Sequence, residues 1–160
     1  MHVQRLRNLL SRDYEVAVFD PYRRGAPVKG TDDVHGCGGA LLAPLARTVV
    51  GIRKFRPDLV HIHVSGMRRF SVIGNLMVPA LPSGVPVLLT IHSGTFTREH
   101  FSQGVVGRAL VRRLLARMTR VIAVSEGVAV LARDMGVPRD RIVKLPAFLP
   151  SEERHAEAVR

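Results

Sequence analysis

Three histidines stand at positions where they could bind a substrate, a metal ion or each other. His61 and His63 lie two residues apart in the apolar segment 59–64 (LVHIHV), and His92 follows a second apolar segment, 86–91 (PVLLTI). Side chains two residues apart in a strand point to the same face, so His61 and His63 should share a face. Three interpretations are open: a metal site, direct substrate contact, or a hydrogen-bonded core position for His61 with His63 lining a cleft. The metal interpretation is the weakest, because no acidic residue is placed to complete a ligand set.

The residues after His92 are small and polar. Ser93 and Thr95 offer hydroxyl groups and backbone donors, and Gly94 allows a ligand to approach the backbone closely. A histidine at the end of a strand can also cap local backbone groups, and this alternative stays open for His92. The composition of this loop nevertheless favours a substrate-binding role.

Polar residues also follow two other apolar segments. Ser65 and Gly66 come after segment 59–64, and Ser125 and Glu126 come after segment 120–124. Ser125 is a good N-cap for a helix, and Glu126 would lie favourably in its first turn. Whether Ser125 and Glu126 also contact a ligand is open at this point.

Alternating strand and helix patterns position these residues. Continuously apolar segments separated by helical periodicity indicate a mainly parallel sheet covered on both faces, which is a doubly wound α/β, Rossmann-like domain. Ligands bind such sheets beyond the carboxyl ends of the strands, where the polar residues above are found. The expected helices cover residues 3–10, 40–55, 70–81, 104–118 and 125–136, and the expected strands cover 14–19, 59–64, 86–91, 120–124 and 141–145, with a long loop over 22–39.

The composition fits one globular domain with an aliphatic core. The chain has 160 residues, of which 46% are hydrophobic but only 5% aromatic. Cys37 is the only cysteine, so no internal disulfide can form and a cytoplasmic setting is expected. The sequence shows no signal-peptide pattern and no apolar run of membrane-spanning length, so we expect a soluble or peripheral protein.

The chain is strongly basic, with a formal net charge of +11. Such a charge attracts polyanions, yet the sequence contains no zinc-finger spacing, aromatic stacking platform or other nucleic-acid-binding signature. Part of the charge lies in the amphipathic stretch 104–118, which is either an ordinary surface helix or a site of peripheral attachment to an anionic membrane. The arginines predicted to face the membrane are Arg108, Arg112, Arg113 and Arg117.

Three motifs in this order resemble the N-terminal domain of the group 1, or family 4, glycosyltransferases, which have the GT-B fold. They are a strand ending in PDLVHIH, a strand ending in TIHSG, and the run RVIAVSEGVAVLARDMGVPRDRIVKLPAF. The last motif is the most specific, because the family typically continues from a serine at a strand end through a helix to Gly-Val-Pro, a short strand and a proline-containing exit. The resemblance covers residues 2–150.

The resemblance implies a hexosyltransferase that moves a sugar from a nucleotide-sugar donor to a glycan or lipid-linked acceptor, with no essential metal and no separate cofactor. His92 would be the catalytic residue, close to the transferred sugar. The remaining substrate-binding residues would be His63, Ser65, Gly66, Ser93, Gly94, Thr95, Ser125 and Glu126.

The chain also departs from the family pattern. The family places a buried first strand and a glycine-rich loop before the first helix, and a donor-binding domain after the exit proline. We therefore expect residues 1–150 to form an incomplete N-terminal domain and residues 151–160 to lead toward a second domain, supplied in cis or in trans. Neighbouring strands should lack a partner, and the chain should be inactive alone. A noncatalytic regulatory or partner-binding role is the alternative.

Overall fold

The computed structural model describes residues 2–20, 34–36, 43–64, 84–92 and 104–145. Within these ranges the helices are α1 (His2–Leu10), α2 (Ala43–Phe55), α5 (Gly104–Leu115) and α6 (Glu126–Asp134), with a short 3-10 helix, η2 (Arg139–Arg141). The strands are β1 (Val18–Asp20), β2 (Val34–Gly36), β3 (Val60–Val64), β4 (Val87–Ile91), β5 (Arg120–Ala123) and β6 (Ile142–Lys144). The helix expected over 70–81 lies outside the described residues.

Most of the expected elements that fall in the described ranges are confirmed, and the errors concentrate near the N-terminus. Only Val18 and Phe19 of the strand expected over 14–19 belong to β1, which ends at Asp20, and the loop expected over 22–39 contains β2. The two strands pair with each other over three residues, from Val18 opposite Val34 to Asp20 opposite Gly36. The apolar pattern of 14–19 overestimated β1, because residues 15–17 have no strand partner among the described residues. The short segment VHG carried no signal for β2.

All described strand pairs are parallel, and they form two sheets. One sheet contains β1 and β2, and the other has the order β3-β4-β5-β6. We call β1, β2 and α2 the two-stranded part and β3 to β6 with α5 and α6 the four-stranded part. In the described ranges no strand of one sheet pairs with a strand of the other, so the single sheet expected from the sequence is divided between β1–β2 and β3.

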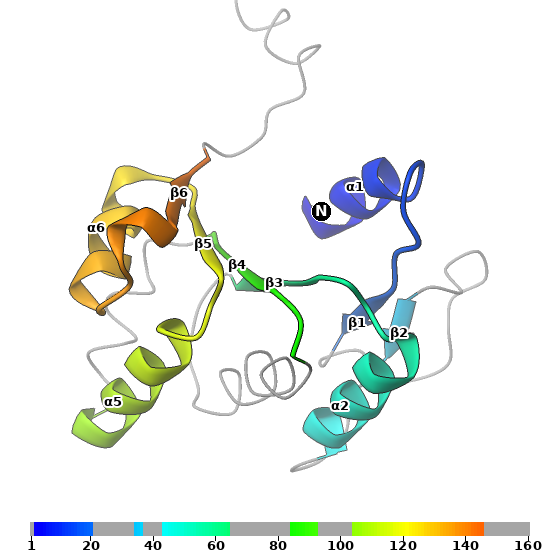
Figure 1. Cartoon of the computed structure of the whole chain (residues 1–160), viewed down its shortest axis with the longest axis horizontal. Coiled ribbons are helices and arrows are strands. Elements are labelled where there is room, and N and C mark those ends of the chain that lie inside the picture. Colours follow the sequence, from blue (N-terminus) through cyan, green and yellow to red (C-terminus); the bar gives the residue numbers. More distant parts are fainter. Residues whose placement is uncertain (1, 21–33, 37–42, 65–83, 93–103, 146–160) are drawn as a thin grey trace, which may run out of the picture.

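Helices lie on both sides of the strands. In Figure 1 the two sheets follow each other along one line, with α2, α5 and α6 below and to the left of this line and α1 above it. Parallel neighbouring strands must be joined by crossover connections, which usually contain a helix. Because these crossovers are right-handed, strands added at one edge of the sheet place their helices on one face, and strands added at the other edge place theirs on the opposite face. This arrangement is the doubly wound, Rossmann-like α/β architecture that the sequence predicted.

The main core belongs to the four-stranded part. Strand residues Leu89, Ile91 and Val121 are fully buried, as are Leu115 and Met118 at the C-terminal end of α5 and beyond it. Together with the apolar face of α6, these residues make one buried cluster. Aliphatic side chains predominate in it, as the low aromatic content predicted.

Helix α6 begins and ends at the predicted residues. The Ser125 hydroxyl accepts a hydrogen bond from the Val128 N–H, which satisfies one of the otherwise unpaired donors of the first turn. At the other end Gly136 adopts a φ of 86°, and the Val137 N–H donates to the Ala132 carbonyl. A left-handed glycine with this bond is the usual C-terminal stop of a helix.

Candidate functional site

The three histidines come together on one face of β3 and β4. In the register of these strands His63 lies opposite Thr90, whereas Val64 lies opposite Ile91. Since side chains alternate along a strand, Val64 and Ile91 point into the buried core and the histidines point to the opposite face. The core and the histidine cluster therefore occupy opposite faces of the same two strands.

His63 and His92 are hydrogen-bonded to each other. His63 Nδ1 lies 3.0 Å from His92 Nε2, and the two rings are stacked with their centroids 5.3 Å apart. One nitrogen of this pair must carry the proton and the other must accept it, so the bond fixes the tautomer of one ring relative to the other. The backbone holds the pair as well, because the His92 N–H donates to the Val64 carbonyl at 2.8 Å.

His61 extends the cluster into the sheet. Its ring lies 4.1 Å from that of His63, and its Nε2 lies 2.7 Å from the hydroxyl oxygen of the buried Thr90. The expected hydrogen bond of His61 is confirmed, but the expected core position is wrong, because His61 is half-buried on the face opposite the main core. Burial lowers the pKa of His61 below its ordinary value of 6.5, and the charge of His92 lowers it further. At neutral pH His61 is therefore uncharged.

The histidines are stacked along the sheet and do not converge on one point. Across the described ranges, no group of three or more His, Cys, Asp or Glu side chains has a geometry that could hold a metal ion. His61 and Thr90 share one hydrogen bond, and His63 and His92 share another. The chemistry that this arrangement allows is hydrogen bonding and proton exchange by imidazole rings.

Ser125 and Glu126 follow β5, the next strand along the sheet, and both are engaged within the chain. Ser125 caps α6. The Glu126 carboxylate forms ion pairs with Lys144 and Arg133, each at 2.9 Å. Hydrogen bonding and charge from Lys144, followed by the weaker effect of Arg133, lower the pKa of Glu126. The structure thus gives both residues a structural role, and their predicted contact with substrate stays a prediction.

Several predicted substrate contacts lie outside the described residues: Ser65, Gly66, Ser93, Gly94 and Thr95.

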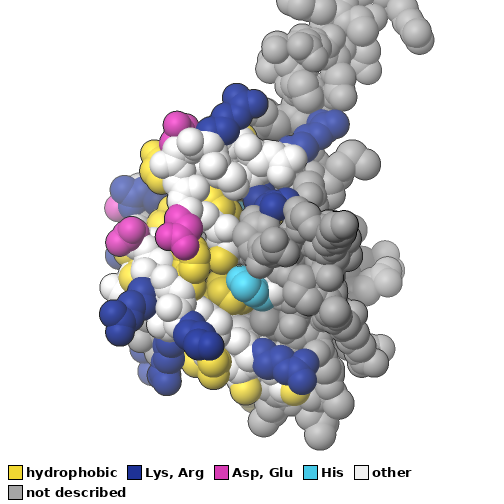
Figure 2. All heavy atoms as spheres, turned by 90° about the vertical axis from the view of Figure 1, so that its right-hand side faces the viewer, with side chains coloured by type: hydrophobic (Ala, Val, Ile, Leu, Met, Phe, Trp, Pro, Cys, Tyr) yellow, Lys and Arg dark blue, Asp and Glu magenta, His cyan; other side chains and the backbone are white. Residues whose placement is uncertain are grey.

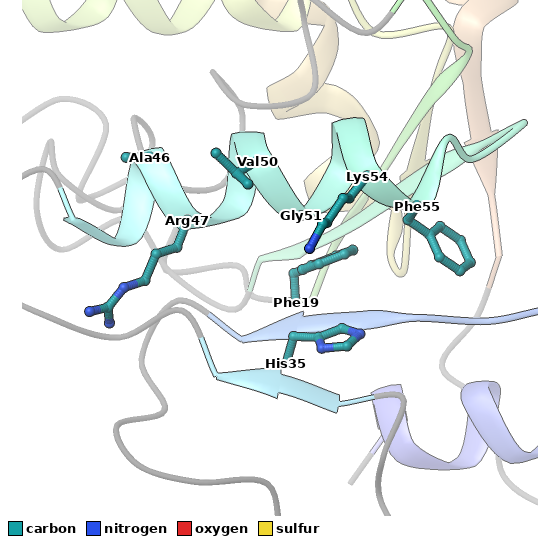
Figure 3. Close-up of a pocket in the computed structure, with 8 residues that line it drawn as sticks. All are labelled: Phe19, His35, Ala46, Arg47, Val50, Gly51, Lys54 and Phe55. Carbon is teal, nitrogen blue, oxygen red and sulfur yellow. The ribbon is translucent and has the colours of Figure 1, made fainter.

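Two features of the described ranges were missed by sequence reasoning. One is the buried hydroxyl of Thr90, for which the only signal was a threonine in an otherwise apolar strand. The other is a pocket of about 630 Å³ between α2 and the β1–β2 sheet, whose walls come from segments distant in sequence (Figure 3).

The helix expected over 104–118 is present but shorter, as α5 (Gly104–Leu115), so Arg117 lies just beyond its end, and its predicted contact with a membrane stays a prediction. Arg112, Arg113 and Arg117 are exposed, and Arg108 is half-buried. Every helix in the described ranges is either too short or too polar to span a bilayer.

Comparison with known proteins identifies the family. A search of curated proteins finds no match to the chain. A family model described as a glycosyl transferase 4-like domain matches residues 4–147, which include the histidine cluster and almost every described element. The chain therefore belongs to the glycosyl transferase 4-like family.

Proposed function

We propose that this chain forms the acceptor-side domain of a hexosyltransferase that moves a sugar from a nucleotide-sugar donor to a glycan or lipid-linked acceptor. Membership of the glycosyl transferase 4-like family supports transfer of a glycosyl group in general. In this proposal the donor is a substrate and no separate cofactor is needed. A second domain, in cis or in trans, binds most of the donor nucleotide.

The observation that carries the proposal is the hydrogen bond between His63 and His92. These residues lie at the carboxyl ends of adjacent parallel strands, which is the edge where ligands bind in doubly wound sheets. His92 is the catalytic residue in this proposal and contacts the transferred sugar. His63 holds the His92 ring in one orientation, and the half-buried His61 supports His63 from within the sheet.

The test is a transfer assay on the protein as it occurs in its source cells, captured through this chain with any partner domain attached. The captured material is supplied with labelled nucleotide sugars and a membrane extract as acceptor. We expect His92→Ala to reduce transfer on the order of 10²-fold, a typical contribution of a positioned acid-base side chain. His63→Ala should reduce transfer less, because His92 remains present.

His2 provides the matched control, since it is a histidine of the same chain that belongs to α1 and not to β3 or β4. His2→Ala should retain the transfer rate of the parent protein. If His92→Ala and His2→Ala were equally active, His92 would have no catalytic role. If captured parent protein transferred no sugar from any donor, the noncatalytic regulatory or partner-binding alternative would replace the proposal.

Helix α5 favours a second candidate function, attachment to the inner, cytoplasmic face of a membrane. Val105 and Val106 are 74% and 81% exposed at the start of this helix, and Arg112, Arg113 and Arg117 are exposed further along. Two apolar side chains that can enter the acyl region, followed by cations at headgroup level, suit an anionic bilayer surface. Attachment there would bring a lipid-linked acceptor close to the domain.

Vesicle sedimentation tests this attachment. We expect the chain to bind vesicles containing phosphatidylglycerol at low salt and to be released at high salt, because exposed charges are screened. The double substitution Val105→Ser and Val106→Ser should weaken binding without changing the net charge. Equal binding to neutral vesicles, or no loss in the double variant, would contradict an interfacial role for α5.

A further inference from the structure

An open pocket lies in the two-stranded part, away from the histidine cluster. It is a pocket of about 630 Å³ whose floor is the β1–β2 sheet and whose roof is α2. Its described lining includes no residue of the histidine cluster. Its volume falls in the range of small-molecule sites, which is roughly 300–1,000 Å³.

The floor of the pocket is aromatic. Phe19 of β1 and His35 of β2 stack with ring centroids 5.2 Å apart and an interplanar angle of 25°. Phe19 is held from above by α2 at Gly51, where a Cβ in place of the glycine hydrogen would lie 2.8 Å from Phe19 Cδ1. Only a residue without a side chain lets this ring lie against the helix. Phe55 adds a second phenyl ring at the C-terminal end of α2.

One face of α2 provides the rest of the lining. Arg47, Val50, Gly51 and Lys54 have the spacing i, i+3, i+4 and i+7, which places them along a single helix face. Val50 is 60% exposed, so its apolar side chain is open to the pocket and to solvent. Lys54 extends from α2 toward the strands, and Arg47 extends from the same helix at the other end of the pocket (Figure 3).

The charged side chains among the described lining residues are cations. The lining of the pocket includes the cations of Arg47 and Lys54 together with the imidazole of His35, and no Asp or Glu is among the described residues that line it. On the side of the molecule that carries α1, β1, β2 and α2, Lys and Arg side chains lie around patches of hydrophobic surface, with Asp and Glu side chains also on this face (Figure 2). An apolar, aromatic cavity with cations at its rim is complementary to an anion that has an apolar body.

We infer that this pocket binds a small phosphate ester with an aromatic body. The aromatic body of the ligand packs along the edge of the Phe19–His35 pair and against Val50, and its phosphate contacts Lys54. Arg47, about 10 Å from Lys54 along the helix axis, contacts the far end of a longer ligand or attracts the anion during entry. This site is separate from the proposed sugar-transfer site, and the inference does not depend on sugar transfer.

Calorimetric titration of the full 160-residue chain with 1-naphthyl phosphate tests the inference, in phosphate-free buffer at low ionic strength. We expect one saturable site. Inorganic phosphate, which lacks the aromatic body, and 1-naphthol, which lacks the anion, should each bind at least tenfold more weakly. Inorganic phosphate binding as tightly as the ester would overturn the inference, because the aromatic floor would then contribute nothing.

Arg53 and Lys54 give a matched pair of substitutions. Both are exposed residues in the last turn of α2, but only Lys54 lines the pocket. Lys54→Glu should weaken binding of the ester at least tenfold, and Arg53→Glu should change it less than twofold. Equal weakening by both would mean that the general positive charge attracts the ligand, and the pocket would have no specific role.

A spectroscopic readout keeps the inference testable if a variant loses its fold. In the parent chain with ¹³C-labelled aromatic side chains, the resonances of Phe19 and His35 should shift with the same saturation curve as the calorimetric titration. Saturable binding without any shift at Phe19 or His35 would place the ligand elsewhere and overturn the inference.

Discussion

The two-stranded and four-stranded parts have similar parallel architecture but very different packing. The largest fully buried side chains of the described structure all belong to residues 89–135, in the four-stranded part. In the two-stranded part, all three residues of β1 are only half-buried, and the buried residues of α2 are Pro44, Thr48 and Ile52. Sheets of four strands covered by two helices can exclude water from a continuous core, whereas a pair of three-residue strands cannot.

The difference in packing suggests that the four-stranded part contributes most of the stability of the fold and that the two-stranded part leaves space for a ligand. The histidine cluster lies on the face of β3 and β4 opposite the core, where hydrogen bonds from His61 to Thr90 and between His63 and His92 orient the rings. The pocket of the two-stranded part lies where packing is incomplete, and exposed apolar residues there leave room for a ligand. Ligand-binding regions are generally drawn from the less stable parts of a fold. We therefore expect substitutions in the two parts to have unequal effects.

Leu89→Ala should have the largest effect. Leu89 is fully buried at the centre of the sheet, and truncating such a residue typically lowers the free energy of unfolding by roughly 2–5 kcal/mol through lost burial and cavity formation. Urea unfolding followed by circular dichroism measures the loss. Ile52→Ala, in the two-stranded part, should lower the free energy of unfolding by less. An equal decrease for both variants would contradict the difference in packing.

Ser125→Ala should have an intermediate effect. The Ser125 hydroxyl caps α6 through the Val128 N–H, and removal of such a cap costs about 1 kcal/mol. The same unfolding experiment measures the change. Ser125→Asp, which restores an acceptor at the N-cap, should recover most of the lost free energy. Failure of Asp to recover it would point to a role for Ser125 other than capping.

The pH dependence of unfolding should report on His61. Its pKa is lowered in the folded state, so as pH falls through 6.5 the unfolded chain binds a proton at this position before the folded chain does. Stability should therefore decrease as pH falls through 6.5 and continue to decrease until the folded-state pKa of His61 is passed. His61→Gln should make this dependence shallower in unfolding midpoints measured between about pH 7.5 and 5.

At about pH 7.5, where His61 is neutral in both states, any difference between His61→Gln and the parent reports lost contacts alone. An unchanged slope below pH 6.5 in His61→Gln would mean that His61 does not contribute to the acid sensitivity of the four-stranded part.

Glu126→Gln should have the smallest effect. The ion pairs of Glu126 with Arg133 and Lys144 are on the surface, where water and salt weaken them. We expect its urea midpoint to be the same as that of the parent within measurement error. A decrease in the free energy of unfolding as large as that of Ser125→Ala would show that the ion pairs of Glu126 stabilise the packing of α6 against β6 more than their exposure suggests.

The amino-acid sequence alone determined the local elements and the edge at which to search for a site. Apolar runs and helical periodicity identified β3, β4, β5 and the helices around them, because burial imposes those patterns directly on the sequence. Ser125, Gly136 and Pro138 fixed the limits of α6 through local backbone chemistry. Parallel topology then placed His63 and His92 at neighbouring strand ends.

Only the tertiary structure decided how distant residues meet. The bond from His63 to His92 and the bond from His61 to Thr90 each join positions 29 residues apart, and they depend on the register of β3 against β4. The pairing of β1 with β2 and the pocket formed by Phe19, His35 and Lys54 have no local signal, because their contacts form between segments that are distant along the chain. Register and long-range packing arise from the competition among all possible pairings, which no single segment encodes.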